Sequence, residues 1–537
     1  MATYTHPGIY VQEIAGPSSI QGASTSVAAF VGVTEFGPYE QPTLVTSWNA
    51  YQRQFGGLIW HGMASWAVYE FFAEGGTTCY VVRVKDNAGT VANVTIDGLT
   101  LNTVTPGLWG NALSLMISNG NNADNTLTSP VFTVTILAEA ATVNAPSPNR
   151  LLQEFIVQNN LSKQRIGDKD YYPLEVFNGF TASSLTSGAG QPSQLATTIN
   201  NHSPFIRIPI SDAAVTGKRP PNNQQPLPFI NGTQPSYQFV TALETLSTIQ
   251  GLSLLAVPDI VLTTDAVGNF NYAQQSTLIN AGLSFCQQLT SLFYVIDPPF
   301  GLSVQDILSF KSSTNSGGMQ ALDSSYGAIY YPWVWIFNPI SNTNVPIPPS
   351  GAALGRYAYT DVNVGVFKSP AGVNDGALAS VVAVETTLTN SDQDQLNPQG
   401  INAIRSLPNY GNVMWGARTL AIGSEWTYIS IRRLFIYVEQ SLKQSLQWVV
   451  FEPNDQQLWT SVVRDISAFL TTLWQQGGLF GSTPREAFFV ICDVSNNSPA
   501  NIVLGELYID IGLAPVRPAE FVIIRMVQKT AGAGIET

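Results

Sequence analysis

The chain has 537 residues, of which 45% are hydrophobic and only 11% are charged, and its formal net charge is −13. Soluble domains usually contain about 25% charged residues, so this chain has little solvating charge for a length that fits about three or four domains. The acidic balance argues against a nucleic-acid-binding protein, which needs a basic surface. Because the cores of protein interfaces are depleted in charge, we expect other subunits to cover much of the surface.

Charge is also unevenly distributed along the chain. Residues 1–400 carry 13 basic and 25 acidic side chains, whereas residues 401–537 carry 10 basic and 11 acidic ones. The last quarter is therefore denser in charge and nearly balanced, which predicts a separate C-terminal domain. The N-terminus lacks the basic and apolar regions of a secretory signal, and no apolar run reaches the ~18–20 residues that span a bilayer. We expect a soluble protein made in the cytoplasm, without direct membrane insertion.

Residues 1–25 are predicted to form an extended arm. Ala15 to Ser26 is rich in Gly, Ser and Thr and offers little to pack, which is typical of a flexible tether. Fully extended, this tether would span up to about 40 Å at ~3.3–3.6 Å per residue. Before it lies a short β-prone run that consists of Ile9, Tyr10, Val11, Gln12, Glu13 and Ile14.

An α/β rhythm begins after the arm. Val27 to Val33 has the pattern of a buried strand, and Ser47 is placed to cap a helix that runs toward Phe55. A helix is expected from Ala64 to Phe72, followed by a strand from Cys79 to Val84. This alternation of strand and helix predicts an α/β domain.

The next 270 residues are predicted to divide between two domains. Residues 91–149 contain alternating, β-branched runs between Asn- and Gly-rich loops, which predicts an inserted β-rich module on the outside. Residues 150–360 return to α/β patterns and are assigned with 26–90 to one central domain. Two of its apolar strands are followed by Asp259 and Asp297, and carboxylates are typical of the C-terminal ends of parallel strands.

Residues 361–537 are predicted to be a C-terminal α+β domain. Its first helix has apolar residues at helical spacing, namely Ile431, Leu434, Phe435, Val438, Leu442, Leu446 and Val449. A second helix is expected from Asn454, as its N-cap, to Gly477, where it ends. Two β-prone segments, Leu507 to Leu513 and Phe521 to Val527, close the chain.

The residue types that carry catalysis are sparse and scattered. The chain has three histidines and three cysteines, with no metal-ligand spacing, no nucleophile elbow and no phosphate-binding loop. A hydrolase built from Asp259 or Asp297 with His202 is compatible with the sequence, although nothing beside any serine supports it. We therefore predict no catalytic residue, no cofactor and no metal.

Several strings along the chain form a recognisable ordered set. They are PGIYVQEI (Pro7 to Ile14), VAAFVGVTEFGP (Val27 to Pro38), LVTSWNAYQRQFGG (Leu44 to Gly57), KSPAGVNDGAL (Lys368 to Leu378), LNPQGINAIR (Leu396 to Arg405), YISIRRL (Tyr428 to Leu434), VVFEPND (Val449 to Asp455) and APVRPAEFVI (Ala514 to Ile523). This set resembles the contractile tail sheath family of phages and phage-tail-like injection machines. The resemblance runs almost end to end, and only 120–200 and 215–240 contribute little to it.

The resemblance implies a structural polymer rather than an enzyme. Sheaths of this family form stacked rings, commonly six-fold, around an inner tube, between a baseplate and a terminal cap. They shorten and widen to drive the tube through a target envelope, and their central domain is subtilisin-like in topology. A single chain that carries both the N-terminal and C-terminal portions is similar to the sheaths of phages and free particles, which are assembled in the cytoplasm and released by lysis or used from inside the cell.

The resemblance also assigns roles to residues. The family's terminal arms join neighbouring subunits by adding strands to their sheets, which gives this role to Ile9 to Ile14 and to a second set, Phe521, Val522, Ile523, Ile524, Arg525, Met526 and Val527. The C-terminal domain is expected to face the tube through Arg432, Arg433, Glu439 and Lys443. For the two arginines, a merely solvated helix face is the alternative. Trp415, Arg418 and Trp426 are interpreted as structural rather than as interface residues.

Two functions of other classes stay open. One is an α/β hydrolase, which would need a base beside a nucleophile. The other is a β-rich adhesin or glycan-binding protein that uses the 91–149 module, in which Trp109 and an Asn-rich loop lie.

Overall fold

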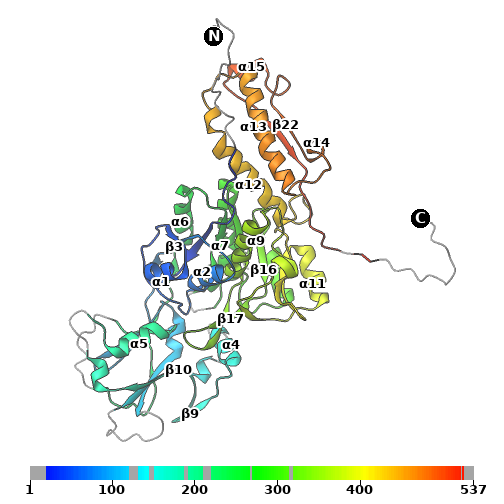
Figure 1. Cartoon of the computed structure of the whole chain (residues 1–537). Coiled ribbons are helices and arrows are strands. Elements are labelled where there is room, and N and C mark those ends of the chain that lie inside the picture. Colours follow the sequence, from blue (N-terminus) through cyan, green and yellow to red (C-terminus); the bar gives the residue numbers. More distant parts are fainter. Residues whose placement is uncertain are drawn as a thin grey trace, which may run out of the picture.

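The computed structural model describes residues 20–119, 131–143, 150–186, 191–209, 219–265, 269–313, 319–521 and 523–524. These residues form three parts in a row (Figure 1). An outer module lies at one end, a domain built on a large sheet lies in the middle, and a unit of two long helices lies at the other end. No helix among these residues is long and apolar enough to cross a membrane.

The central domain is built on a mixed sheet whose order is β2-β3-β1-β14-β15-β16-β20-β21. The strands from β3 to β20 pair in parallel, and only the two edge strands, β2 and β21, are antiparallel. In this order the strands are Thr43–Val45, Cys79–Arg83, Ala28–Gly32, Leu254–Ala256, Phe293–Ile296, Gly327–Tyr331, Ile401–Leu407 and Gly411–Met414. The predicted α/β domain is confirmed as a mixed α/β protein with a large mixed sheet.

Helices cover both faces of this sheet. Ala28 and Phe30 of β1 contribute to the core that includes α2 (Met63–Ala73) and α9 (Ser350–Asn363), whereas Ala29 and Val31 contribute to the core that includes α7 (Tyr272–Leu289). Since successive side chains of a strand point to opposite faces, the uniformly apolar β1 is explained by burial on both sides. The predicted cap is also confirmed, because the Ser47 hydroxyl accepts from the Ala50 N–H at the start of α1 (Trp48–Phe55).

The outer module is larger than the sequence predicted. Its sheets have the orders β12-β7-β8-β10-β9 and β11-β6-β5. These strands are Leu227–Pro228, Leu113–Asn119, Phe132–Glu139, Lys169–Phe180 and Gln164–Ile166 in the first sheet, and Ile206–Arg207, Leu99–Thr103 and Asn93–Ile96 in the second. Residues 164–228 therefore belong with the predicted module 91–149 through strand pairing, not with the central sheet.

The boundary expected at residue 360 also differs from the strand pairing. Helix α9 runs through it, and β20 at 401–407 pairs with β16 of the central sheet. A further small sheet, β18-β17-β19, consists of Thr343–Ile347, Val334–Asn338 and Val381–Val384. The central domain thus extends to β21, and the separate C-terminal unit begins afterwards.

The C-terminal unit packs α12 (Ile429–Ser445) against α13 (Gln456–Gln475) beside a two-stranded hairpin, β22 (Phe488–Ile491) and β23 (Asp510–Leu513). The N-cap of α13 is Asp455, whose carboxylate accepts from the N–H groups of Gln457 and Leu458. The expected cap, Asn454, instead accepts from the Trp459 indole N–H.

Shorter elements complete the described chain. The helices are α3 (Ala140–Val143), α4 (Arg150–Gln158), α5 (Gln194–His202), α6 (Phe239–Glu244), α8 (Val304–Ser312), α10 (Gly372–Asp375), α11 (Asn390–Leu396), α14 (Pro484–Ala487) and α15 (Pro499–Val503). The short strands β4 (Asp86–Asn87) and β13 (Ser236–Tyr237) pair with each other where the chain enters and leaves the outer module.

Candidate assembly surface

The two carboxylates that end parallel strands accept hydrogen bonds within the fold, and Asp297 accepts from the Ser350 N–H at 2.8 Å. Asp259 is 1% exposed and accepts from the N–H groups of Val33, Met63 and Ala64, which fixes the start of α2 to the end of β1. Burial raises the pKa of Asp259 to about 7, although these hydrogen bonds oppose the shift. His202 lies at the end of α5 in the outer module. The structure therefore does not assemble the hydrolase constellation that the sequence left open.

The described residues contain no group of three or more His, Cys, Asp or Glu side chains that could hold a metal ion. Cys79, Cys286 and Cys492 are each buried and unpaired with another cysteine.

Exposed apolar side chains are concentrated on the C-terminal unit. Twelve of the 28 large hydrophobic side chains that are exposed in the described chain lie between residues 450 and 524. They are Val450, Phe451, Phe480, Phe489, Ile491, Val494, Val503, Leu504, Tyr508, Phe521, Ile523 and Ile524. Such a concentration of apolar surface is typical of a protein–protein interaction site.

Phe451 shows this exposure most strongly. It lies between α12 and α13, its side chain is 102% exposed, and its backbone has a φ of 73°. The left-handed region costs a residue other than glycine about 1–2 kcal/mol, and exposing a phenylalanine leaves its apolar area in water. Neither cost is offset by the described residues, and this placement of Phe451 is what an interface residue would show.

The β22–β23 hairpin offers open strand edges beside these apolar groups. Within the described chain it pairs with no other strand, and Phe489 and Ile491 are exposed on it. A two-stranded sheet is marginally stable alone, and its unpaired N–H and C=O groups can accept an added strand. The hairpin therefore has the geometry of a strand acceptor.

The N-terminal segment is held on α12. The Gln21 and Ala23 N–H groups donate to the hydroxyls of Ser445 and Ser441, at 3.1 and 2.9 Å. We call residues 20–26 the strap. The expectation of a flexible tether that reaches Ser26 is therefore wrong for these residues, because α12 supplies side-chain acceptors one helical turn apart.

The remaining predicted strand-exchange residues divide into two groups. Ile9 to Ile14, Val522 and 525–527 lie outside the described residues. Phe521, Ile523 and Ile524 are 73%, 80% and 78% exposed and belong to no described strand. Just before them, Glu520 pairs with Arg418 at 2.5 Å, which anchors the C-terminal segment to the body and supports the structural interpretation of Arg418.

The four predicted tube-facing residues differ in exposure. Arg432 is buried, lies over the rings of Tyr326 and Trp426 at 4.2 and 4.6 Å, and pairs with Glu439 at 3.6 Å. Arg433 is also buried, in an ion pair with a residue of α9. The interpretation of the two arginines as tube-facing thus loses its support, because their guanidinium groups are used inside the chain. Glu439 and Lys443 are exposed, and for them it stays a prediction.

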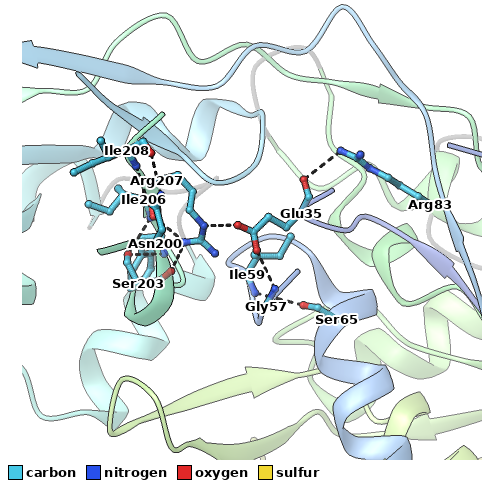
Figure 2. A network of polar contacts seen from close by, with 11 residues as sticks. Glu35, Gly57, Ile59, Ser65, Arg83, Asn200, Ser203, Ile206, Arg207 and Ile208 are labelled. Carbon is cyan, nitrogen blue, oxygen red and sulfur yellow. Dashed lines mark hydrogen bonds and ion pairs between the residues drawn. The ribbon is translucent and has the colours of Figure 1, made fainter. Parts of the chain in front are cut away.

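Figure 2 shows how the outer module is tied to the central domain. Glu35, which follows β1, accepts from Arg207 of β11 at 2.5 Å and from the Gly57 N–H at 2.9 Å. Arg83 of β3 donates to the Glu35 carbonyl at 3.3 Å. The Arg207 and Glu35 side chains are 15% and 20% exposed, so solvent screens this pair less than a surface pair.

Comparison with known families decides what kind of protein has this surface. The chain matches "Phage tail sheath protein central domain" over residues 262–420 and "Phage tail sheath C-terminal domain" over residues 423–529. The chain belongs to the phage tail sheath family. This is a structural family rather than an enzymatic one. The two matches meet between β21 and α12, where strand pairing also separates the domains.

Curated relatives of this phage tail sheath protein include tail sheath proteins of several phages. The chain is 25% identical over 246 residues to that of Vibrio phage KVP40, with 44% of this chain and 36% of the relative covered. It is 28% identical over 232 residues to that of Burkholderia phage BcepMu, with 42% and 46% covered. The matched region thus spans less than half the length of these relatives.

Solved structures share the sheath fold over nearly the whole chain. The PVC sheath complex of an extracellular contractile injection system, in its contracted state, has a TM-score of 0.57 and 21% identity, with 98% of this chain and 99% of that chain covered. The contracted helical sheath of the anti-feeding prophage has a TM-score of 0.55 and 24% identity, with 98% and 100% covered. The outer module, which lies outside both family matches, is included in this coverage.

Proposed function

We propose that this chain is the sheath subunit of a contractile phage tail or injection system, and that it polymerises as stacked rings around an inner tube. The concentration of exposed apolar side chains on the C-terminal unit, beside an unpaired hairpin, is the observation that carries the proposal. An isolated chain would leave this apolar surface exposed to water, whereas a polymer buries it. The low charge of the whole sequence has the same explanation.

Neighbouring subunits are joined by exchanged strands in this proposal. Ile9 to Ile14 of one subunit and Phe521 to Val527 of another add to the open edges of a third subunit's β22–β23 hairpin. Each added backbone hydrogen bond contributes about 0.5–1.5 kcal/mol net. An arm that fits a different surface on its neighbour makes a heterologous contact, which propagates into helices or stacked rings rather than closing as a dimer.

The strap limits how far the N-terminal arm can reach. Since residues 20–26 are held on α12, only the five residues 15–19 separate the strap from the proposed exchange strand Ile9 to Ile14. At ~3.3–3.6 Å per residue, this linker spans at most about 20 Å. The arm would therefore start from α12 of the C-terminal unit, close to the exposed apolar side chains of the same unit.

The remaining partners follow from the family. Six subunits form each ring in this proposal, as in the six-fold symmetrised anti-feeding prophage baseplate, and the polymer runs from a baseplate to a terminal cap. The C-terminal unit faces the inner tube, with Glu439 and Lys443 as polar contacts. The central domain has the family's subtilisin-like topology, and contraction is a rigid-body rearrangement of linked subunits. Assembly takes place in the cytoplasm, and the particle is released by lysis.

Removing the arm tests strand exchange without touching the described structure. Deletion of residues 1–19 keeps the strap, and we expect folded subunits that form no cylinders by negative-stain electron microscopy. The deleted chain still carries the acceptor hairpin, so a small fraction of it mixed with the full chain should cap growing polymers and shorten them. Cylinders of unchanged length in the mixture would show that the arm is not the linker.

A further inference from the structure

A pair of buried carboxylates lies at the C-terminal end of α2. Glu70 is 0% exposed and Glu74 is 2% exposed, and they lie one helical turn apart. The negative end of the helix dipole opposes negative charge at this position, and α2 has no basic residue in its last turn. Two charged carboxylates here would be costly, because buried charges need a partner of opposite sign.

Ser380 connects the two carboxyl groups. Its hydroxyl oxygen lies 2.5 Å from Glu70 Oε2 and 2.5 Å from Glu74 Oε1, and its N–H donates to Glu74 Oε1 at 2.8 Å. A serine hydroxyl has one hydrogen to donate. It can donate to one carboxylate, and the second contact needs a hydrogen supplied by the other carboxyl group. One of the two glutamates must therefore be protonated.

The extra N–H bond decides which glutamate keeps the charge. Because the Ser380 N–H donates to Glu74 Oε1 and not to Glu70, we assign the shared proton to Glu70. Glu70 Oε1 and Glu74 Oε2 each lack a hydrogen-bond partner in the described chain, so two charged carboxylates would be especially costly here. Burial raises the pKa of Glu70 to about 8, and the charge of Glu74 adds to the shift, while the hydrogen bond with Ser380 opposes it.

Neighbouring charges do not neutralise the pair. The titratable or charged side chains on elements packed against α2 are Tyr51 and Arg53 of α1, Asp259 of the 3-10 helix η4 (Pro258–Leu262), Arg356, Tyr357, Tyr359 and Asp361 of α9, and Tyr69 of α2 itself. Arg356, the cation on α9, donates to the Asp375 carbonyl and lies over the Tyr359 ring. Arg53 is exposed on α1. Neither glutamate forms an ion pair within the described chain.

The carboxyl pair lies directly against α9. A Cβ atom added to Gly355 would lie 2.7 Å from Glu74 Cβ, and one added to Gly351 would lie 2.4 Å from the Ala67 carbonyl, so the two helices touch without side chains between them. Further along α9, Asp361 binds Arg433 of α12. Helix α9 therefore connects the carboxyl pair to the C-terminal unit.

We propose that Glu70, Ser380 and Glu74 share one proton at neutral pH, and that this proton holds the contact between α2 and α9, so that base loosens the joint to the C-terminal unit. The direction of the pH effect on stability follows from the difference between the pKa of Glu70 in the folded and unfolded chain. The folded chain keeps a proton that the unfolded chain releases above a pKa of 4.5. The stabilisation is thus complete below 4.5 and lost as the pH rises through about 8. In this window the folding equilibrium weakens by up to about tenfold per pH unit.

Hydrogen exchange of α9 amides in the full chain, corrected for the intrinsic pH dependence of exchange, tests the proposal between pH 5 and pH 9. In the unsubstituted protein we expect protection of α9 to fall as the pH rises toward about 8 and to level off above it. Glu70→Gln should keep its protection, because an amide donates to the Ser380 hydroxyl as the protonated acid does. Glu175→Gln is the matched control. Glu175 accepts from the Ser203 hydroxyl, and burial raises its pKa to about 8, but it lies in the outer module. The Glu175→Gln substitution should therefore leave the pH dependence of α9 protection unchanged.

Two outcomes would overturn the proposal, and a third applies if Glu70→Gln does not fold. One is a Glu70→Gln chain whose α9 protection falls with pH as in the unsubstituted protein. The other is loosening of α9 by a chelator at neutral pH, which would show that a metal ion rather than a proton joins the carboxylates. If Glu70→Gln does not fold, Glu74→Gln gives the same test, because removal of the neighbouring charge should reduce the loss of protection in base. An unchanged loss there would also contradict the proposal.

Discussion

Arg433 of α12 lies 2.5 Å from Asp361 of α9, in an ion pair whose side chains are 4% and 1% exposed. The same guanidinium donates to the Thr25 carbonyl of the strap at 2.9 Å and lies 4.9 Å from the Tyr357 ring. One side chain thus joins the central domain, the C-terminal unit and the N-terminal strap.

Replacing Arg433 by methionine should weaken this joint strongly. The substitution leaves the Asp361 carboxylate buried without its cation, which costs about 3–5 kcal/mol when one partner of a buried pair is removed. We expect the opening free energy of α12, measured by native-state hydrogen exchange, to fall by about this amount. Lys443→Met, on the exposed face of the same helix, is the control and should change it by less than about 0.5 kcal/mol. Equal effects of the two substitutions would contradict the assigned role of Arg433.

Arg207→Ala should loosen the outer module from the central domain. It removes the hydrogen-bonded ion pair with Glu35, and bonds to charged groups contribute about 1.5–3 kcal/mol each. The opening free energy of β11 should fall by that amount in hydrogen exchange. Arg165→Ala removes a pair with Asp170 whose side chains are 63% and 42% exposed, and it should cost less than about 1 kcal/mol. A larger loss of opening free energy in Arg165→Ala than in Arg207→Ala would contradict the role of Arg207 in joining the outer module to the central domain.

The sequence predicted elements whose patterns are local. The buried strand from Val27 to Val33, the Ser47 cap and the two long C-terminal helices appear close to their predicted positions, although Asp455 and not Asn454 caps the second helix. The extent of the outer module did not follow from such patterns. Strand β10 contains Pro173 and Gly179, which interrupt a strand pattern, and its pairing with β8 is set by tertiary structure.

The candidate surface was predictable only in part. Apolar spacing identified the buried stripe of α12 and placed the two arginines off it, yet α9 and the strap cover that side as well. Burial by a helix that is distant in the sequence cannot be predicted from the apolar spacing of α12. Phe451 was recognised within a family string, but its exposure and its left-handed backbone depend on how the helices meet around it.

Phe451→Asn should separate assembly from folding. Asparagine tolerates the left-handed region, so the stability of the single chain should change by less than about 0.5 kcal/mol. An apolar anchor in an interface contributes about 2 kcal/mol or more, so the concentration needed for polymerisation should rise about 30-fold. Val157→Asn, at a 68% exposed position on α4, should not change that concentration. Normal assembly of the Phe451 variant would remove Phe451 from the interface.

Gly22→Ala should displace the strap from α12. A Cβ atom at this position would lie 2.3 Å from the Tyr437 hydroxyl, which is too close for any real contact. We expect the amides of Gln21 and Ala23 to lose protection from hydrogen exchange, since their bonds to the α12 serines depend on this close approach. Adding Tyr437→Phe removes the obstructing oxygen and should restore much of the protection. If Gly22→Ala alone leaves the amides protected, the strap is held by other contacts.

Electron microscopy of the purified full chain tests the sheath assignment most directly. Negatively stained samples at a concentration that saturates assembly should show long, hollow, striated cylinders built of stacked rings. Phe451→Asn, prepared in the same way, should show folded subunits and few cylinders. A full chain that remains a monodisperse monomer under all these conditions, alone and with a cognate inner tube, would contradict the account.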